Sequence, residues 1–310
     1  MRITQSMIIE NFNRNLTQNL KRLADVNDMI AAQRKIRRPS DDPVGAALAL
    51  KLRRQLSAIE QYNSNAKDAL TWMKDTETAL TNVGDILQRL NELTVQAANG
   101  TLTPEDREKI LYEVRELKDQ LLQEANSTSI NRYIFGGYIT DKPPFAIVEK
   151  KIDGELRKVV ELNPEIPDEG KTIDDNDFLE YNLGRSERIP INLIGPEVFE
   201  DIFDAVESLE NALETNDSEA ISGDVLEDIK NSLGIVLKYR AQIGARTNRL
   251  EATVSRLDAN EVDYLELLNN TEGIDLAELI TELKMEESIY RASLSVGARI
   301  IQPTLVDFLR

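Results

Sequence analysis

The chain has 310 residues and a mass of 35.0 kDa, enough for two domains or for one elongated domain with its own core. Its 37 basic and 55 acidic residues give a net charge of −18, so it lacks the excess of positive charge that a nucleic-acid-binding protein needs. The absence of cysteine and histidine removes disulfides, the common zinc sites and the usual nucleophile–histidine pairs, so we expect no enzyme, no catalytic residue, no cofactor and no metal site.

The first predicted element is an amphipathic helix within residues 1–40, a segment with eight basic and three acidic residues. It has no apolar core followed by a small-residue cleavage site, which predicts that no secretory signal is cleaved from it. The chain also has no apolar run of about 18 residues, so no membrane insertion is expected. The apolar stripe of this helix comprises Ile9, Phe12, Leu16, Leu23, Val26 and Ile30.

A short charged loop follows, made of Arg37, Arg38, Pro39, Ser40, Asp41, Asp42 and Pro43. One interpretation is a helix cap with solvated charges, in which Asp42 caps the next helix and Pro43 takes its first position. The other is a contact point that fixes the angle between the first helix and the next. The residues alone leave both interpretations open.

A long helix is predicted from Asp42 to Asn99, because apolar residues alternate at spacings of four and three from Leu48 to Ala97. Such a period keeps one stripe of the helix facing a partner, as in a coiled coil. Thr103 and Pro104 then open a second helix, which is expected to turn back and pack antiparallel to the first.

The segment 136–196 changes character, because half of the prolines and glycines of the chain lie there. Residues 145–151 and 156–162 are strand-like and flank Asp153 and Gly154, which is a strong hairpin signal. Residues 189–194 are a further strand candidate, and 197–213 return to a helical pattern. We therefore predict a small, acidic, β-containing domain inserted between helices.

The period of the long helix returns from Leu226 to Leu268, and these two segments are expected to pair. A last amphipathic helix follows Gly273, and Pro303 should kink or end it. Its apolar stripe comprises Leu276, Ile280, Leu283, Tyr290, Leu294 and Ile301.

The predicted fold is therefore mainly α: a long antiparallel α-helical coiled-coil rod made from the N- and C-terminal halves, with a small β-containing domain inserted in the middle. The predicted segments are an N-terminal amphipathic helix (1–40), rod helices (41–135), the inserted domain (136–196), rod helices (197–272) and a C-terminal amphipathic helix (273–310). The two terminal stripes are the candidate assembly interface, because two isolated helices bury little area by themselves.

Four segments in order resemble the bacterial flagellin family of axial proteins, on the branch that joins the flagellar hook to the filament. They are Arg38–Ala47 (RPSDDPVGAA), Leu93–Gly100 (LTVQAANG), Asn131–Phe145 (NRYIFGGYITDKPPF) and Ala241–Leu250 (AQIGARTNRL). The resemblance covers about residues 1–145 and 186–310.

This resemblance implies a structural protein that assembles with other copies of itself and contacts hook-associated protein 1 and flagellin. It also implies a cytoplasmic export chaperone, export without a cleaved signal peptide, and a final place in the extracellular flagellum. A flagellin filament subunit is the alternative within the family. An intracellular coiled-coil scaffold and a protein on the membrane surface are the alternatives outside it.

Overall fold

The computed structural model describes residues 5–99, 102–152, 155–164 and 178–300. It divides into two compact units. The central unit is Glu60–Asp258, and the terminal unit combines Met1–Ile59 with Ala259–Arg310. The elements are mainly long helices, as the fold prediction requires, and helix α2 (Pro43–Ala97) is 55 residues long.

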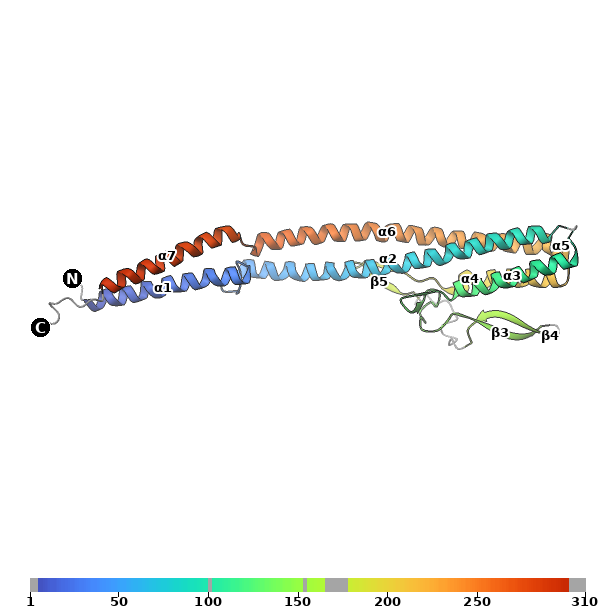
Figure 1. Cartoon of the computed structure of the whole chain (residues 1–310), viewed down its shortest axis with the longest axis horizontal. Coiled ribbons are helices and arrows are strands. Elements are labelled where there is room, and N and C mark those ends of the chain that lie inside the picture. Colours follow the sequence, from blue (N-terminus) through green and yellow to red (C-terminus); the bar gives the residue numbers. More distant parts are fainter. Residues whose placement is uncertain (1–4, 100–101, 153–154, 165–177, 301–310) are drawn as a thin grey trace. The chain divides into compact units, whose positions relative to one another are not determined.

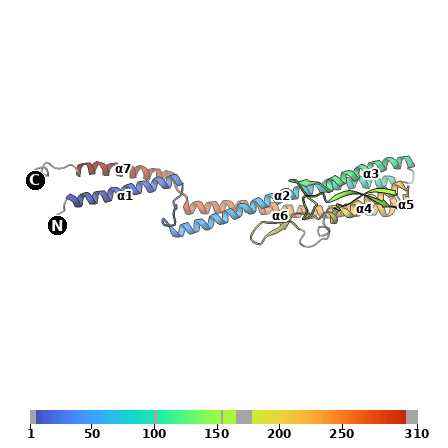
Figure 2. The same ribbon diagram turned by 90° about the horizontal axis from the view of Figure 1, so that it is seen from below.

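In the central unit, α2 lies beside α6 (Leu226–Glu272), and Figures 1 and 2 show them running together. The side chain of Asn63 donates a hydrogen bond to Asp258 at 2.6 Å, and Lys74 lies 3.5 Å from Glu251, so the two helices are antiparallel. The predicted seam is confirmed from Ala66 onward, where every α2 seam position is buried, whereas Leu48 at its predicted start is exposed. The seam positions from Ala66 onward are Ala66, Ala69, Met73, Thr76, Leu80, Val83, Leu87, Leu90, Thr94 and Ala97.

Two polar residues lie in this seam without disrupting it. The hydroxyl of Thr76 donates to the carbonyl oxygen of Trp72 at 2.8 Å, and that of Thr94 donates to the carbonyl oxygen of Leu90 at 2.7 Å. Each buried hydroxyl is therefore satisfied within its own helix, so the seam needs no polar partner on the other helix.

The next helix, α3 (Pro104–Ala125), begins as its sequence predicts. The side chain of Thr103 accepts a hydrogen bond from the backbone N–H of Asp106, and Pro104 occupies the first turn. Arg89 of α2 bonds Glu113 of α3 at 2.7 Å. Asn82 of α2 bonds Glu124 of α3 at 3.1 Å, which confirms that α3 runs antiparallel to α2.

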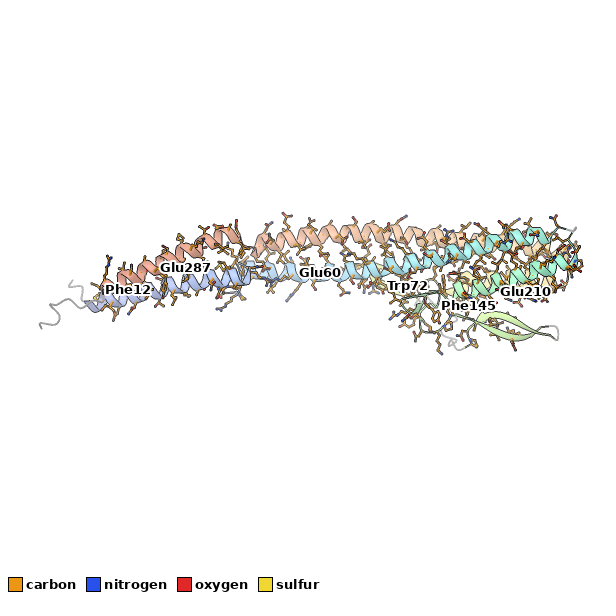
Figure 3. The ribbon with its side chains drawn as sticks, viewed as in Figure 1. Phe12, Glu60, Trp72, Phe145, Glu210 and Glu287 are labelled. Atoms are coloured by element: carbon orange, nitrogen blue, oxygen red, sulfur yellow. The ribbon has the colours of Figure 1, made fainter. Side chains whose placement is uncertain are left out.

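Helix α4 (Gly195–Glu214) packs on α3 and is followed by the short helices α5 (Ser218–Ala220) and η2 (Ile221–Val225). Glu210 of α4, labelled in Figure 3, accepts hydrogen bonds from Arg115 at 2.7 Å and from Lys118 at 2.9 Å. Burial alone would raise the pKa of Glu210, but these two cations outweigh it and hold the pKa below its usual value.

The β-containing part consists of three antiparallel pairs among the described residues. They are β1 (Thr128–Ser129) with β2 (Arg132–Tyr133), β3 (Phe145–Ile152) with β4 (Glu155–Leu162), and β5 (Glu180–Asn182) with β6 (Arg188–Pro190). The register of β3 and β4 runs from Phe145 opposite Leu162 to Ile152 opposite Glu155, which confirms the predicted strands. Their predicted turn at Asp153 and Gly154 lies outside the described residues.

The strand predicted over residues 189–194 is only partly correct, because β6 ends at Pro190. The next four residues, Ile191 to Ile194, are all buried, although their side chains would alternate between two faces in a half-exposed strand. They form the buried approach to α4 instead, where Ile194 makes an isolated antiparallel bridge to Gly136.

An aromatic cluster forms the core of the inserted region. Phe199 contacts Phe135 and Phe145 edge-on, with ring centroids 4.8 and 5.6 Å apart, and Phe203 lies 5.3 Å from Phe145. The backbone N–H of Gly195 donates to the carbonyl oxygen of Phe135 at 2.9 Å, and a Cβ at Gly195 would crowd that oxygen and the Phe145 ring. Glycine is therefore required where α4 starts against this cluster.

Two asparagines fasten the base of the β3–β4 hairpin. Asn126 donates to the carbonyl oxygen of Phe145 at 2.9 Å and accepts from the backbone N–H of Phe145 at 3.0 Å. The side chain of Asn163 donates to the carbonyl oxygen of Pro143 at 3.0 Å, and its backbone N–H donates to that of Pro144 at 2.9 Å. Asn126 thus bonds the start of β3 through both its donor and its acceptor, and Asn163 joins the exit of the hairpin to its entry.

A single carboxylate ties the β5–β6 connection to α6. Glu187 accepts hydrogen bonds from Arg256 at 2.8 Å and from Arg249 at 3.1 Å. These bonds hold the pKa of Glu187 below its ordinary value of 4.5, and the bond from Arg256 has the largest effect.

Replacement Glu187→Gln should lower the free energy of unfolding at pH 7 by less than about 1 kcal/mol, because the pair is partly solvated. Since the folded state lowers this pKa, the contribution is present above the unfolded pKa and disappears as the pH falls through the folded value. Urea unfolding of the parent and of Glu187→Gln at pH 7 and at pH 3 measures this contribution to the free energy of unfolding. Glu149→Gln, at an exposed position of β3, is the control, and an equal difference at both pH values would contradict the prediction.

Candidate assembly interface

The interface predicted from the terminal stripes is built on α1 (Gln5–Ala32) and α7 (Leu276–Ile300), which lie side by side in the terminal unit (Figures 1 and 2). On α1 the predicted stripe is the covered face. Val26 is buried, and the other five residues are half-buried: Ile9, Phe12, Leu16, Leu23 and Ile30.

The α7 stripe is only partly the one that faces α1. Leu283 and Tyr290 are half-buried, whereas Leu276, Ile280 and Leu294 are 45%, 45% and 44% exposed. The prediction that these three pack against α1 in the same chain is therefore wrong. Ile301 lies outside the described residues.

The covered seam of α7 contains Leu279, Leu283, Glu286, Tyr290, Ser293 and Gly297. It shares Leu283 and Tyr290 with the predicted stripe, whereas Leu279 and Ser293 each precede a predicted residue by one position, which is about 100° around the helix. The sequence favoured the wrong face because its large aliphatic side chains are more numerous there. The correct face carries the carboxylate of Glu286 and the hydroxyl of Ser293, which a search for apolar spacing overlooks.

Specific contacts fix how the two helices meet. The side chain of Asn19 donates a hydrogen bond to Ser293 Oγ at 2.9 Å, and Arg22 lies 3.8 Å from Glu286. A Cβ at Gly297 would overlap the ring of Phe12, so the glycine leaves the space that this ring fills. Figure 3 shows the place of Phe12 on α1 and of Glu287 on α7.

A shallow groove of about 510 Å³ runs along this pair of helices. Its apolar lining comes from both helices and includes Phe12, Leu16, Ile289 and Val296. Met7, Leu20, Ile280 and Leu294 are exposed elsewhere on the same two helices. Two paired helices therefore leave much of their apolar surface uncovered, which is the property expected of a surface that other chains cover.

The predicted contact loop bonds both to α1 and to the start of α2. Arg37 lies 2.5 Å from Asp28 and 3.5 Å from Asp25, both on α1. Asp41 accepts the backbone N–H groups of Arg38 and Arg37, at 2.9 and 3.2 Å. These bonds lower the pKa of Asp41, and the bond from Arg38 has the largest effect.

The remaining loop residues either cap α2 or are exposed to solvent. Asp42 accepts the N–H of Val44 at 3.1 Å, so it caps α2, and Pro43 is the first residue of that helix. The hydroxyl of Ser40 lies 3.4 Å from Asp41, and Arg38, Pro39 and Ser40 are exposed. Both interpretations of the loop thus describe part of it: Asp42 is a cap and Arg37 is a contact to α1.

Glu272, the last residue of α6, was not found from the sequence. Its buried carboxylate bonds Arg53 of α2 and lies 3.8 Å from Arg34, and its carbonyl oxygen accepts the N–H of Lys35 at 2.8 Å. A negative charge at a helix C-terminus opposes the helix dipole, so the two arginines are needed to stabilise it there. Glu272 therefore joins α2, α6 and the loop after α1.

We expect Glu272→Gln to loosen this junction, because the neutral amide weakens its bonds to both arginines. A loss of about 1–2 kcal/mol of local stability would speed amide hydrogen exchange about 5- to 30-fold in the loop and in the last turn of α6. Hydrogen–deuterium exchange with mass spectrometry measures this, with Glu266→Gln at an exposed position of α6 as the control. Unchanged exchange at the loop would refute the role of Glu272.

Within the part of the chain that the structure describes, no cluster of three or more acidic residues is arranged to hold a metal ion. In the same residues, none of the helices combines the length and the apolar character needed to cross a membrane.

Comparisons with known proteins agree with the mainly helical fold. Residues 3–140 match the bacterial flagellin N-terminal helical region. The flagellar hook-associated protein 3 of Escherichia coli is 26% identical over 94% of this chain and 95% of its own length. A flagellin of Bacillus subtilis is 26% identical over 97% of both chains.

A solved structure shares the fold. The flagellar junction protein FlgL of Legionella pneumophila superposes with a TM-score of 0.56 at 18% identity, covering 74% of this chain and all of its own. The chain is therefore similar to the N-terminal helical region of bacterial flagellins over residues 3–140, and to flagellar hook-associated protein 3 over 94% of its length.

Proposed function

We propose that this chain is a structural subunit of the bacterial flagellum that joins the hook to the filament. The observation that carries the proposal is the likeness to hook-associated protein 3, which covers 94% of this chain and 95% of that protein. The two paired terminal helices with uncovered apolar residues support it, because an axial subunit has to bury such surface against its neighbours.

The terminal helices are the proposed assembly interface. Ile9, Phe12, Leu16, Leu23, Val26 and Ile30 would pack mainly within the pair, together with Leu283 and Tyr290. The outward residues Leu276, Ile280 and Leu294 would contact neighbouring copies, and Ile301 belongs to the same proposed set. Segments 1–40 and 273–310 would then polymerise, 41–135 and 197–272 would supply the rod helices, and 136–196 would be the inserted domain.

The proposed partners are other copies of this chain, hook-associated protein 1 on the hook side and flagellin on the filament side. A cytoplasmic chaperone would bind the chain before export, and export would proceed without cleavage of a signal peptide. The protein would make and break no covalent bond, so its action would be that of an adaptor between two tubes.

A flagellin filament subunit is the second candidate. The 26% identity to the Bacillus subtilis flagellin over 97% of both chains favours it. The two candidates differ in what remains when the gene is lost, since a junction subunit is needed for filament attachment and a filament subunit is the filament itself.

Deletion of the gene in its host separates these functions. Electron microscopy should show hooks without filaments, and a blot of the culture medium should show unpolymerised flagellin. Hooks without filaments and no flagellin anywhere would identify the chain as the filament subunit. Normal filaments would refute both functions and favour an intracellular scaffold.

A further inference from the structure

A polar layer interrupts the apolar seam between α1 and α7. It consists of Asn19 and Arg22 on α1 and of Glu286 and Ser293 on α7. Asn19 donates to Ser293 Oγ at 2.9 Å, and Arg22 donates to Asn19 Oδ1 at 2.5 Å. Arg22 also lies 3.8 Å from Glu286, so the four side chains are linked across the two helices.

The centre of this layer is buried even though each helix has a solvent-facing side. Asn19 is 9% exposed and Glu286 is 6% exposed. Oxygen Oε2 of Glu286 is buried without a hydrogen-bond partner among the described residues. Burying an amide and a carboxylate costs stability unless their partners are in place, so the layer tolerates few alternative arrangements of the two helices.

Apolar packing alone specifies this pair weakly. The α7 seam contains the aliphatic residues Leu279 and Leu283, while Leu276, Ile280 and Leu294 point away from it. One steric feature adds to the polar layer, because the ring of Phe12 fills the space that Gly297 leaves. Phe12 and Gly297 form what we call the ring socket.

From these contacts we infer that the polar layer and the ring socket fix the register of α1 against α7. A shift by one heptad would move α7 about 10 Å along α1. In one direction it would set Phe12 against Tyr290 instead of Gly297, and Asn19 against Glu286 instead of Ser293. Glu286 would then lie away from Arg22, so the shifted pair would leave a buried carboxylate without its cation.

A fixed register gives every copy a terminal helix pair of the same length. The outward residues Ile280 and Leu294 then lie at the same axial position along α1 in each copy, so identical contacts can repeat from one copy to the next. This consequence for assembly rests on the proposed function, whereas the register itself is a property of one chain.

Spin labels can measure the register, because the chain has no cysteine of its own. Lys21→Cys on α1 and Glu278→Cys on α7 place labels at two exposed positions outside the polar layer and the ring socket. Pulsed dipolar spectroscopy of the purified full chain then gives the distance between the labels. The osmolyte trimethylamine N-oxide is added because it favours burial of the helix faces.

The test variant replaces four seam residues by leucine: Phe12→Leu, Asn19→Leu, Glu286→Leu and Ser293→Leu. We call it the levelled variant because it makes the seam uniformly apolar. Its matched control makes the same kind of change at exposed positions of the same helices: Ile8→Leu, Asn13→Leu, Glu287→Leu and Ser295→Leu. We expect one narrow distance in the parent and in the control. The levelled variant should show an additional distance that reflects a displacement of α7 by about 10 Å, which is one heptad.

A single unchanged distance in the levelled variant would overturn the inference, and so would a broad distribution in the parent. Neither result depends on where the protein acts in the cell. A chain that keeps one register but leaves filaments intact when its gene is deleted would refute the proposed function and leave this inference standing.

Discussion

Removal of residues 1–35 should abolish filament attachment while the central unit stays folded. The deletion removes α1 and with it the cover of Leu279, Leu283 and Tyr290 on α7. The remaining helix then loses its partner in the terminal unit, and helices in proteins gain most of their stability from such packing. We therefore expect cells that make the truncated chain to have as few filaments as cells without the gene.

Electron microscopy of complemented deletion cells measures this effect, and a blot verifies that the truncated chain is made. Circular dichroism of the purified chain should show a thermal transition of the central unit close to that of the parent, since Glu60–Asp258 keeps all its residues. Lys21→Ala, at an exposed position of α1, is the control and should support filaments. Filaments on cells with the truncated chain would show that α1 is not part of the assembly interface.

Replacement Phe199→Ala should cause the largest loss of stability from a single side chain. Phe199 is fully buried and touches Phe135, Phe145 and Phe203, so its removal leaves a cavity between α4 and the start of β3. Substitutions of this kind cost about 3–5 kcal/mol in other protein cores. We expect a loss in that range for the central unit.

The fluorescence of Trp72 reports this loss, because it is the one tryptophan of the sequence and lies buried in the central unit. Urea unfolding followed at this residue should give a lower midpoint with a similar slope. Tyr138→Ala is the control, since Tyr138 is exposed and should change stability by less than about 0.5 kcal/mol. A loss below about 1 kcal/mol for Phe199→Ala would mean that the cluster does not hold the inserted region together.

The seam of α2 and α6 could be predicted because a 3.5-residue period sustained over many turns leaves one consistent buried face. The same reasoning failed on α7, which carries aliphatic residues on more than one side, so spacing alone does not tell the face toward α1 from the outward face. The difference is visible in Leu279, which is buried, and Ile280, which is exposed.

The contacts of Glu272 could not be predicted from the sequence, for a different reason. Arg53 lies 219 residues before it in the chain, and a chain with 55 acidic residues offers no local sign that one carboxylate is buried. Polar contacts between distant segments depend on the packing of whole helices. The charged loop could be located from its sequence, but its main ion pairs, from Arg37 to Asp25 and Asp28, required the fold.

The asparagine bonds at the base of the β3–β4 hairpin have a consequence for variation and for engineering. Asn126 and Asn163 bond the chain where it enters and leaves the hairpin, so these two positions are held together independently of the residues farther along the strands. Changes to the end of the hairpin away from these bonds should therefore leave its entry and exit in place. The same property makes the hairpin a position at which a foreign peptide can be displayed while the helical frame is kept.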